Sequence, residues 1–222
     1  MQLPSAPSGD RFQIVEKALQ SQRVGRYLPA AGRSNEKALE YYIWNLSLSE
    51  CFIAPLHYAE IVCRNALHNG LVARAGDQWY LDKTFNSLLD DRYSLELATA
   101  VGDERRQHRD RMTSHHVVSA LTFGFWEHLT TKRFERYLWA RGISAVFPCA
   151  PKGKTHEDLQ RLIESVRRWR NRIAHHRAIF DRGPMRKHAD ALELIRWACG
   201  ETSSWVASNS RVPAVISLRP KP

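Results

Sequence analysis

Residues 162–177 read Leu-Ile-Glu-Ser-Val-Arg-Arg-Trp-Arg-Asn-Arg-Ile-Ala-His-His-Arg, and this stretch has the pattern of an amphipathic helix. At about 100° per residue, one sector of such a helix collects four apolar residues: Leu162, Val166, Trp169 and Ile173. Asn171 and His175 are four residues apart, so they share a face roughly opposite this stripe. Arg170 lies between the stripe and that face. We expect His175 to be displayed on the polar face, and His176, near the edge of the stripe, to be the packing histidine.

Helical patterns continue outward from this stretch in both directions. Thr155-His-Glu-Asp158 resembles a capping box, and the helix that it starts is expected to reach about Phe180. Gly183-Pro184 separates that helix from a last one, which ends near Gly200. The helices expected earlier in the chain span about 10–22, a stretch capped by Ser34 or Asn35, 49–74 with Pro55 inside it, 87–109 and 114–140. Strand-like alternation is nearly absent, so the predicted fold class is all-α.

The division of the chain follows from these patterns. We expect a single helical domain at 10–205, a flexible N-terminal tail at 1–9 and an extended C-terminal tail at 206–222. The four cysteines form no Cys-x-x-Cys pair, which favours buried thiols in a reducing compartment. No apolar stretch approaches the roughly 20 residues that span a bilayer, and the N-terminus lacks the pattern of a signal peptide. The predicted location is therefore the cytoplasm, without a membrane partner.

Positive charge is concentrated near the same stretch. The formal net charge is +10, and residues 161–187 hold nine lysines and arginines against two carboxylates, Glu164 and Asp181. A second cluster contains Arg105, Arg106, Arg109 and Arg111. Such patches attract phosphate backbones without regard to sequence, although a solvated surface accounts equally well for charge alone. No phosphate-binding loop and no Gly-x-Ser-x-Gly elbow is present, so nucleotide hydrolysis and esterase chemistry have no support.

Arg170, Asn171 and His175 together suit the cleavage of RNA. RNA carries its own nucleophile, the 2′-hydroxyl, so a protein has only to move protons and stabilise negative charge. Histidine titrates near neutrality, arginine binds phosphate through two hydrogen bonds, and asparagine can orient either group. This chemistry needs no metal and no cofactor. One helix supplies only one histidine on this face, so an acid–base pair requires two copies of the helix to meet, which predicts a homodimer.

Other candidate residues have competing explanations. Glu60, Arg64 and His68 recur every four residues and share a helical face; either Glu60 and Arg64 form a surface pair, or this face meets the Arg170 helix and helps to build an RNA groove. Adjacent His115-His116 lack a metal-binding pattern. The aromatic residues Phe123, Phe125, Trp126 and Trp139 have helical spacing that favours core packing over base stacking.

Longer blocks of the sequence resemble a known family. Arg170-Asn-Arg-Ile-Ala-His175-His176 is similar to the signature of the HEPN superfamily, in which four to six residues separate an arginine from a histidine. Tyr58-Ala-Glu-Ile-Val-Cys-Arg64-Asn65-Ala-Leu-His68, Leu121-Thr-Phe-Gly-Phe-Trp126, Leu138-Trp139 and Phe147-Pro148 look like the successive blocks of bacterial Abi-like (abortive infection) proteins. The resemblance covers roughly residues 35–205.

The resemblance implies a HEPN-like helical bundle with additional helices and a dimeric, metal-independent endoribonuclease of toxin or phage-defence type. It assigns stabilisation of the phosphorane to Arg170, proton transfer to His175 and positioning to Asn171. Supporting or RNA-binding roles fall to His176, Arg167, Arg172, Arg177, Glu60, Arg64 and Asn65. The implied partners are RNA and an antitoxin or phage-derived trigger. The alternatives are a non-catalytic HEPN module that binds RNA or regulates a defence system, and a helical protein that senses phage components.

Overall fold

The computed structural model describes residues 3–7 and 9–221, and no strand occurs among them. The helices are α1 (Asp10–Leu19), α2 (Ser21–Gly25), α3 (Asn35–Ala75), α4 (Lys83–Leu88), α5 (Asp91–His108), α6 (Ser114–Ala120), α7 (Phe123–His128), α8 (His156–Ala174), α9 (Pro184–Ala198), α10 (Gly200–Asn209) and α11 (Val212–Ser217). Short 3-10 turns lie at Trp79–Leu81, Arg109–Arg111, Lys132–Phe134 and Ile143–Ala145. The all-α prediction is confirmed.

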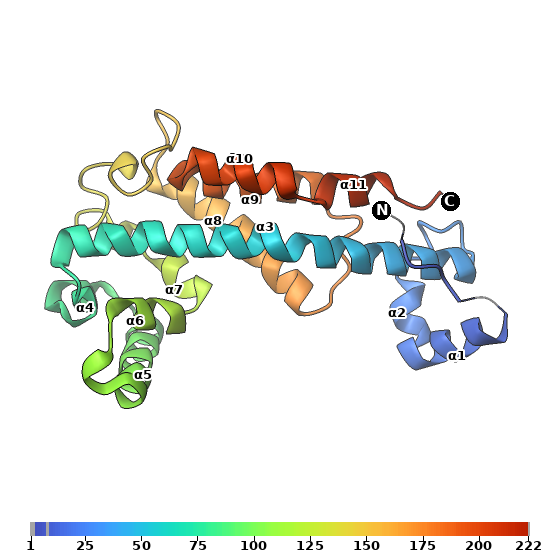
Figure 1. Cartoon of the computed structure of the whole chain (residues 1–222), viewed down its shortest axis with the longest axis horizontal. Helices are drawn as coiled ribbons and strands as arrows, with labels where there is room; N and C mark the ends of the chain where they lie inside the picture. The colour runs from blue at the N-terminus through green and yellow to red at the C-terminus, as the bar shows by residue number, and fades with distance from the viewer. Residues whose placement is uncertain (1–2, 8, 222) are drawn as a thin grey trace.

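Helix α3 is the longest of these helices and runs along most of the length of the molecule (Figure 1). Its 41 residues correspond to about 60 Å at 1.5 Å per residue. Helices α9, α10 and α11 run along one side of it, α4 to α7 gather near one end, and α1 and α2 lie near the other. Two helices were expected in this region, but Pro55 lies inside one continuous helix. Ser34 caps it by accepting a hydrogen bond from the backbone of Lys37 at 3.3 Å, as predicted.

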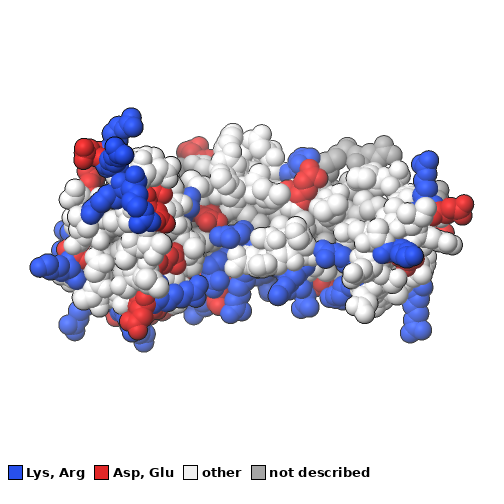
Figure 2. All heavy atoms as spheres, turned by 90° about the horizontal axis from the view of Figure 1, so that it is seen from below, with Lys and Arg blue, Asp and Glu red and all other residues white. Residues whose placement is uncertain are grey.

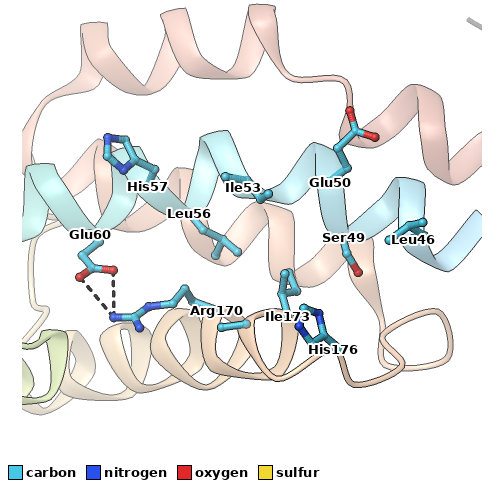
Figure 3. A pocket seen from close by; sticks show the side chains of 11 residues that line it. Leu46, Ser49, Glu50, Ile53, Leu56, His57, Glu60, Arg170, Ile173 and His176 are labelled. Carbon is cyan, nitrogen blue, oxygen red and sulfur yellow. Dashed lines mark hydrogen bonds and ion pairs between the residues drawn. The ribbon is translucent and has the colours of Figure 1, made fainter.

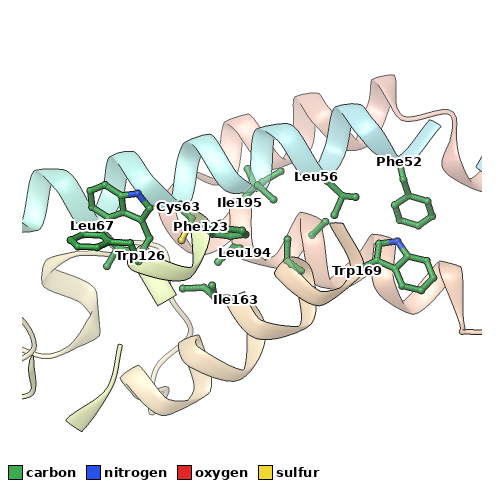
Figure 4. Packing of buried hydrophobic residues seen from close by; sticks show 14 of the residues in the cluster. Phe52, Leu56, Cys63, Leu67, Phe123, Trp126, Ile163, Trp169, Leu194 and Ile195 are labelled. Atoms are coloured by element: carbon green, nitrogen blue, oxygen red, sulfur yellow. The ribbon is translucent and has the colours of Figure 1, made fainter. Parts of the chain in front are cut away.

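The core forms where α3, α8 and α9 meet, with α7 closing one end (Figure 4). Phe52 and Leu56 of α3 face Trp169 of α8, and the rings of Phe52 and Trp169 are 5.4 Å apart. The core role predicted for the aromatic residues is confirmed, because Phe123, Phe125, Trp126 and Trp139 are all buried. Burial of a large apolar side chain stabilises a fold by about 1.5–3 kcal/mol. This cluster therefore fixes the position of α8 against α3 and α9.

The buried stripe of α8 differs from the expected one. Val166 and Trp169 are buried as predicted, whereas Leu162 and Ile173 are only partly buried. Leu159 and Ile163 complete the buried set instead. The covered sector is broader than the expected stripe because α8 contacts both α3 and α9. Leu162 and Ile173 are only partly buried because each lines an open groove beside α8.

Three further expectations are wrong. The helix expected at 114–140 is divided into α6, α7 and turns, because Thr122 caps α7 by accepting from the backbone of Phe125 at 3.3 Å. The helix expected to reach Phe180 ends at Ala174. The segment 206–222, expected to be extended, contains α11, which docks where Val215 accepts a 2.7 Å hydrogen bond from Trp44 Nε1. Within the expected flexible tail at 1–9, residues 1, 2 and 8 lie outside the described residues.

Buried histidines make the stability of this fold depend on pH. Desolvation lowers the pKa of His68, His128 and His188 below the ordinary 6.5. The folded state therefore binds fewer protons than the unfolded chain in mild acid, so stability is complete above about pH 6.5 and is lost as the pH falls below it. We expect a lower urea midpoint at about pH 5.5 than at about pH 8. His188→Gln should weaken this dependence; equal midpoints in the parent protein would contradict the assignment.

Candidate functional site

The motif residues lie at the C-terminal end of helix α8. This helix begins with the predicted capping box: Thr155 Oγ1 accepts from the backbone of Asp158 at 3.3 Å, and the Asp158 carboxylate accepts from the backbone of Thr155 at 3.1 Å. Such a cap contributes about 1 kcal/mol. The cap sets where α8 starts, and the burial of Val166 and Trp169 sets its rotation. Arg170 and Asn171 therefore lie on its last turn.

The chain turns sharply after Ala174. His175 is the C-cap residue, and its N–H donates to the Asn171 carbonyl at 2.9 Å. His176 adopts a positive φ of 52°, which is uncommon outside glycine, and its carbonyl accepts a 2.8 Å hydrogen bond from Arg23 of α2. Both imidazoles are exposed. The prediction that His176 packs into the core is wrong, because the helix has ended before it.

His175 lies in a hollow lined with guanidinium groups. The hollow measures about 410 Å³ and is lined by Arg168, Asn171, Arg172, His175 and Arg177. Burial and the neighbouring guanidinium groups of Arg182 and Arg177 lower the pKa of Arg172. The Arg172 side chain is fixed by a 2.8 Å hydrogen bond from its Nε to the Ala178 carbonyl. No carboxylate lines this hollow. Arg168 pairs with Glu164 at 2.6 Å, but Arg172 and Arg177 form no ion pair with a described residue, so the hollow suits an anion.

The Arg170 guanidinium points to a different part of the surface (Figure 3). Its Nη2 lies 3.1 Å from Oε2 of Glu60 and 3.2 Å from Oε1, in a groove of about 840 Å³ between α3 and α8. The apolar side chains of Leu46, Ile53 and Ile173 line the groove, and His176 lies at its other end. The step of five positions from Arg170 to His175 corresponds to a rotation of about 140° around the helix axis. Within one chain, the structure thus brings Asn171 to His175, and His176 to the groove of Arg170.

Most of the residues to which the sequence analysis gave supporting roles lie outside the hollow. Glu60 pairs with Arg170 and not with Arg64, so the face of α3 that carries Glu60 does meet the Arg170 helix. Nε of Arg64 is buried without a hydrogen-bond partner among the described residues, and Asn65 is exposed. Arg167 does not line the hollow, because its guanidinium pairs with Glu127 of α7. Arg168 was not identified on the sequence, although its spacing of seven residues from His175 is the signal that would have placed the two side chains on one helical face.

The sequence carries a recognisable family pattern over most of its length. A family model described as Abi-like protein matches residues 12–181. The chain belongs to the Abi-like protein family. The match includes the hollow and the groove and ends before α9. No curated protein and no solved structure matches the chain. In the part of this Abi-like protein that the structure describes, no helix is both long enough and apolar enough to cross a bilayer.

The paired histidines of the Abi-like protein have a structural role. His116 Nδ1 accepts from the backbone of Thr113 at 3.0 Å and completes a capping box at the start of α6. Its ring stacks on His108, with the two centroids 3.8 Å apart. His115 lies against the buried His68, at 5.1 Å between centroids. Across residues 3–7 and 9–221, no cluster of three or more histidine, cysteine or acidic side chains could hold a metal ion.

Asn45 of the Abi-like protein fixes the turn that carries the two motif histidines. Its buried Oδ1 accepts from the backbone of Ile179 at 2.8 Å and of Phe180 at 3.1 Å. Asn45→Ala leaves both donors buried without an acceptor, and we expect it to lower the free energy of unfolding by about 2–4 kcal/mol. Urea denaturation measures this loss. Asn69→Ala, on an exposed side chain of the same helix, should change little; equal losses in both variants would show that Asn45 does not support the turn.

Proposed function

We propose that this Abi-like protein is a metal-independent endoribonuclease that serves in phage defence by abortive infection. One observation carries the proposal: the exposed imidazole of His175 shares a hollow with Asn171 and three guanidinium groups. Lysine and arginine side chains also gather along one edge of the molecule (Figure 2). A titratable group beside fixed positive charge is what cleavage of a phosphodiester next to a 2′-hydroxyl requires. We also infer membership of the HEPN superfamily, which the Arg170-x4-His175 spacing at the end of a helix supports.

The proposed reaction is an internal transesterification. The RNA 2′-hydroxyl gives up its proton to a base and attacks the adjacent phosphorus, while the bond from phosphorus to the 5′-oxygen breaks. An acid protonates that leaving oxygen, so the products carry a 2′,3′-cyclic phosphate and a 5′-hydroxyl. His175 moves the proton, Asn171 positions the reacting groups, and Arg168, Arg172 and Arg177 hold the phosphate. Arginine is suited to the charge that accumulates on the phosphorane oxygens.

The position of Arg170 supports a homodimer. The groove between α3 and α8 exposes Leu46 and Ile53 by 57% and 61%, and apolar side chains that gather in one exposed groove mark a candidate interface. It carries Arg170 towards one end and His176 towards the other. A two-fold axis through its middle would place the turn that carries His175 and His176 in each copy near the arginine end of its partner, and so bring His175 of one copy towards Arg170 of the other. An arginine and a histidine that diverge within one chain would then act on one phosphate.

The histidine at the centre of the proposal can be removed without disturbing the core, because His175 is exposed. We expect the purified protein to cleave RNA in the presence of EDTA. We expect His175→Ala to lower the rate by about 10²–10⁴-fold, the usual contribution of a general acid or base. End-group mapping of the fragments should find cyclic phosphates. RNA binding should survive in the variant. Binding without cleavage by the parent protein would favour a non-catalytic RNA-binding module.

Mixing two inactive variants tests the dimer. Arg170→Ala and His175→Ala copies each lack one group, but a mixed dimer contains one composite site with both. We expect the mixture to recover a substantial part of the activity, and each variant alone to remain inactive. Ile53→Lys should place a charge in the apolar groove, give a monomer by light scattering and abolish the recovery. A parent protein that is monomeric and active would remove the dimer from the proposal.

A further inference from the structure

A second polar groove lies on the same face of α8 as the His175 hollow. Five residues of the helix recur at spacings of four and three, which places them in one strip: Arg161, Ser165, Arg168, Arg172 and His175. The last three line the hollow. The first two line a groove of about 640 Å³ between α8 and α9. The groove and the hollow are therefore consecutive sites along one helix face.

The groove has a mixed hydrogen-bonding character that the hollow lacks. Ser165 donates its hydroxyl proton to the Asp190 carboxylate, and Lys187 Nζ lies 2.6 Å from Ser165 Oγ and 3.3 Å from Asp190 Oδ2. Arg186 is exposed at the same groove and forms no ion pair with any described residue. Four cationic side chains and three carboxylates line it in all: Lys154, Arg161, Arg186 and Lys187 with Asp158, Asp190 and Glu193.

This character fits a nucleotide better than a bare phosphate. Arg186, which forms no ion pair with a described residue, can hold phosphate oxygens. In contrast, Oδ1 of Asp190 can accept hydrogen bonds from sugar hydroxyls or base N–H groups, because Ser165 and Lys187 contact only Oδ2. A site that only neutralises phosphates would have no use for three carboxylates. The edges of bases are accessible in single strands and largely hidden in RNA helices. The groove thus has the donors and acceptors to contact an unpaired nucleotide through its phosphate and its polar edges.

We infer that the groove between α8 and α9 is a subsite for single-stranded RNA, adjoining the phosphate held at His175. The inference rests on the proposed function, because the hollow supplies the neighbouring phosphate site. Ser165 and His175 are ten residues apart, or about 15 Å along the helix axis. A strand that occupies both sites must extend past the reacting phosphate, so the groove acts on the affinity and choice of longer RNAs. Its residues do not take part in the proton transfer.

The test measures RNA binding on a His175→Ala background, which removes cleavage. Two labelled single strands are compared: one of about three nucleotides, which is shorter than a usual strand-binding site, and one of about ten, which is within the usual range of about 4–16 nucleotides. We expect Arg186→Ala combined with Lys187→Ala to weaken binding of the long strand by about tenfold. The slope of the logarithm of affinity against the logarithm of salt concentration should also become shallower, by the equivalent of about one to two phosphate contacts. Binding of the short strand, held at the hollow, should change by less than about twofold.

Arg136→Ala combined with Arg141→Ala is the matched control, because both arginines are exposed and line neither the groove nor the hollow. It should leave both affinities unchanged, and thermal unfolding checks that the groove variant, Arg186→Ala with Lys187→Ala, folds. The subsite is overturned if the groove variant binds both strands equally more weakly, or if its affinity for the long strand is unchanged. If neither strand binds the background protein, both the subsite and the proposed function are overturned. Length-dependent binding by a parent protein that does not cleave RNA overturns the nuclease alone and leaves the subsite in place.

Discussion

The hydrogen bonds accepted by the buried side chain of Asn45 decide how α8 ends. Two consecutive backbone N–H groups, those of Ile179 and Phe180, meet one amide oxygen in the core. A helix that continued to Phe180 would have used those donors within its own backbone. Because the chain leaves the helix at Ala174, His175 and His176 turn to different sides of α8. His175 lines the guanidinium hollow and His176 lines the groove of Arg170. Both candidate surfaces therefore depend on where α8 ends.

The ends of α8 show what sequence can predict and what it cannot. Its start was predicted because a capping box is local: four consecutive residues contain both the donors and the acceptors. Its end was not predicted because the deciding acceptor, Asn45, lies 134 residues away from Ile179 along the chain. The all-α class and the buried aromatic residues of α7 followed from periodicity and composition. The width of the buried stripe did not, since it depends on α9 covering a second side of α8.

The same distinction applies to the candidate site. Arg170, Asn171 and His175 were identified from their types and spacing, but spacing assumes an ideal helix beyond Ala174. The proximity of Glu60 to Arg170 was one of two alternatives on the sequence and was settled by the contact of α3 with α8. The groove of Ser165 and Lys187 was not identified, because surface residues on a charged helix look alike until a neighbouring helix is placed beside them.

The docking of α11 has a consequence for the order of events during synthesis. Trp44 precedes Asn45, and its indole nitrogen donates to the carbonyl of Val215, which is 171 residues later in the chain. Tyr41, one helical turn before Asn45, donates similarly to the carbonyl of Pro220. A nascent chain that has emerged only as far as α9 already contains every residue of the hollow, yet the partners of Trp44 and Tyr41 have not been made. Complete packing around Asn45, and with it the final geometry of the histidine turn, therefore comes after translation of residues 215–220.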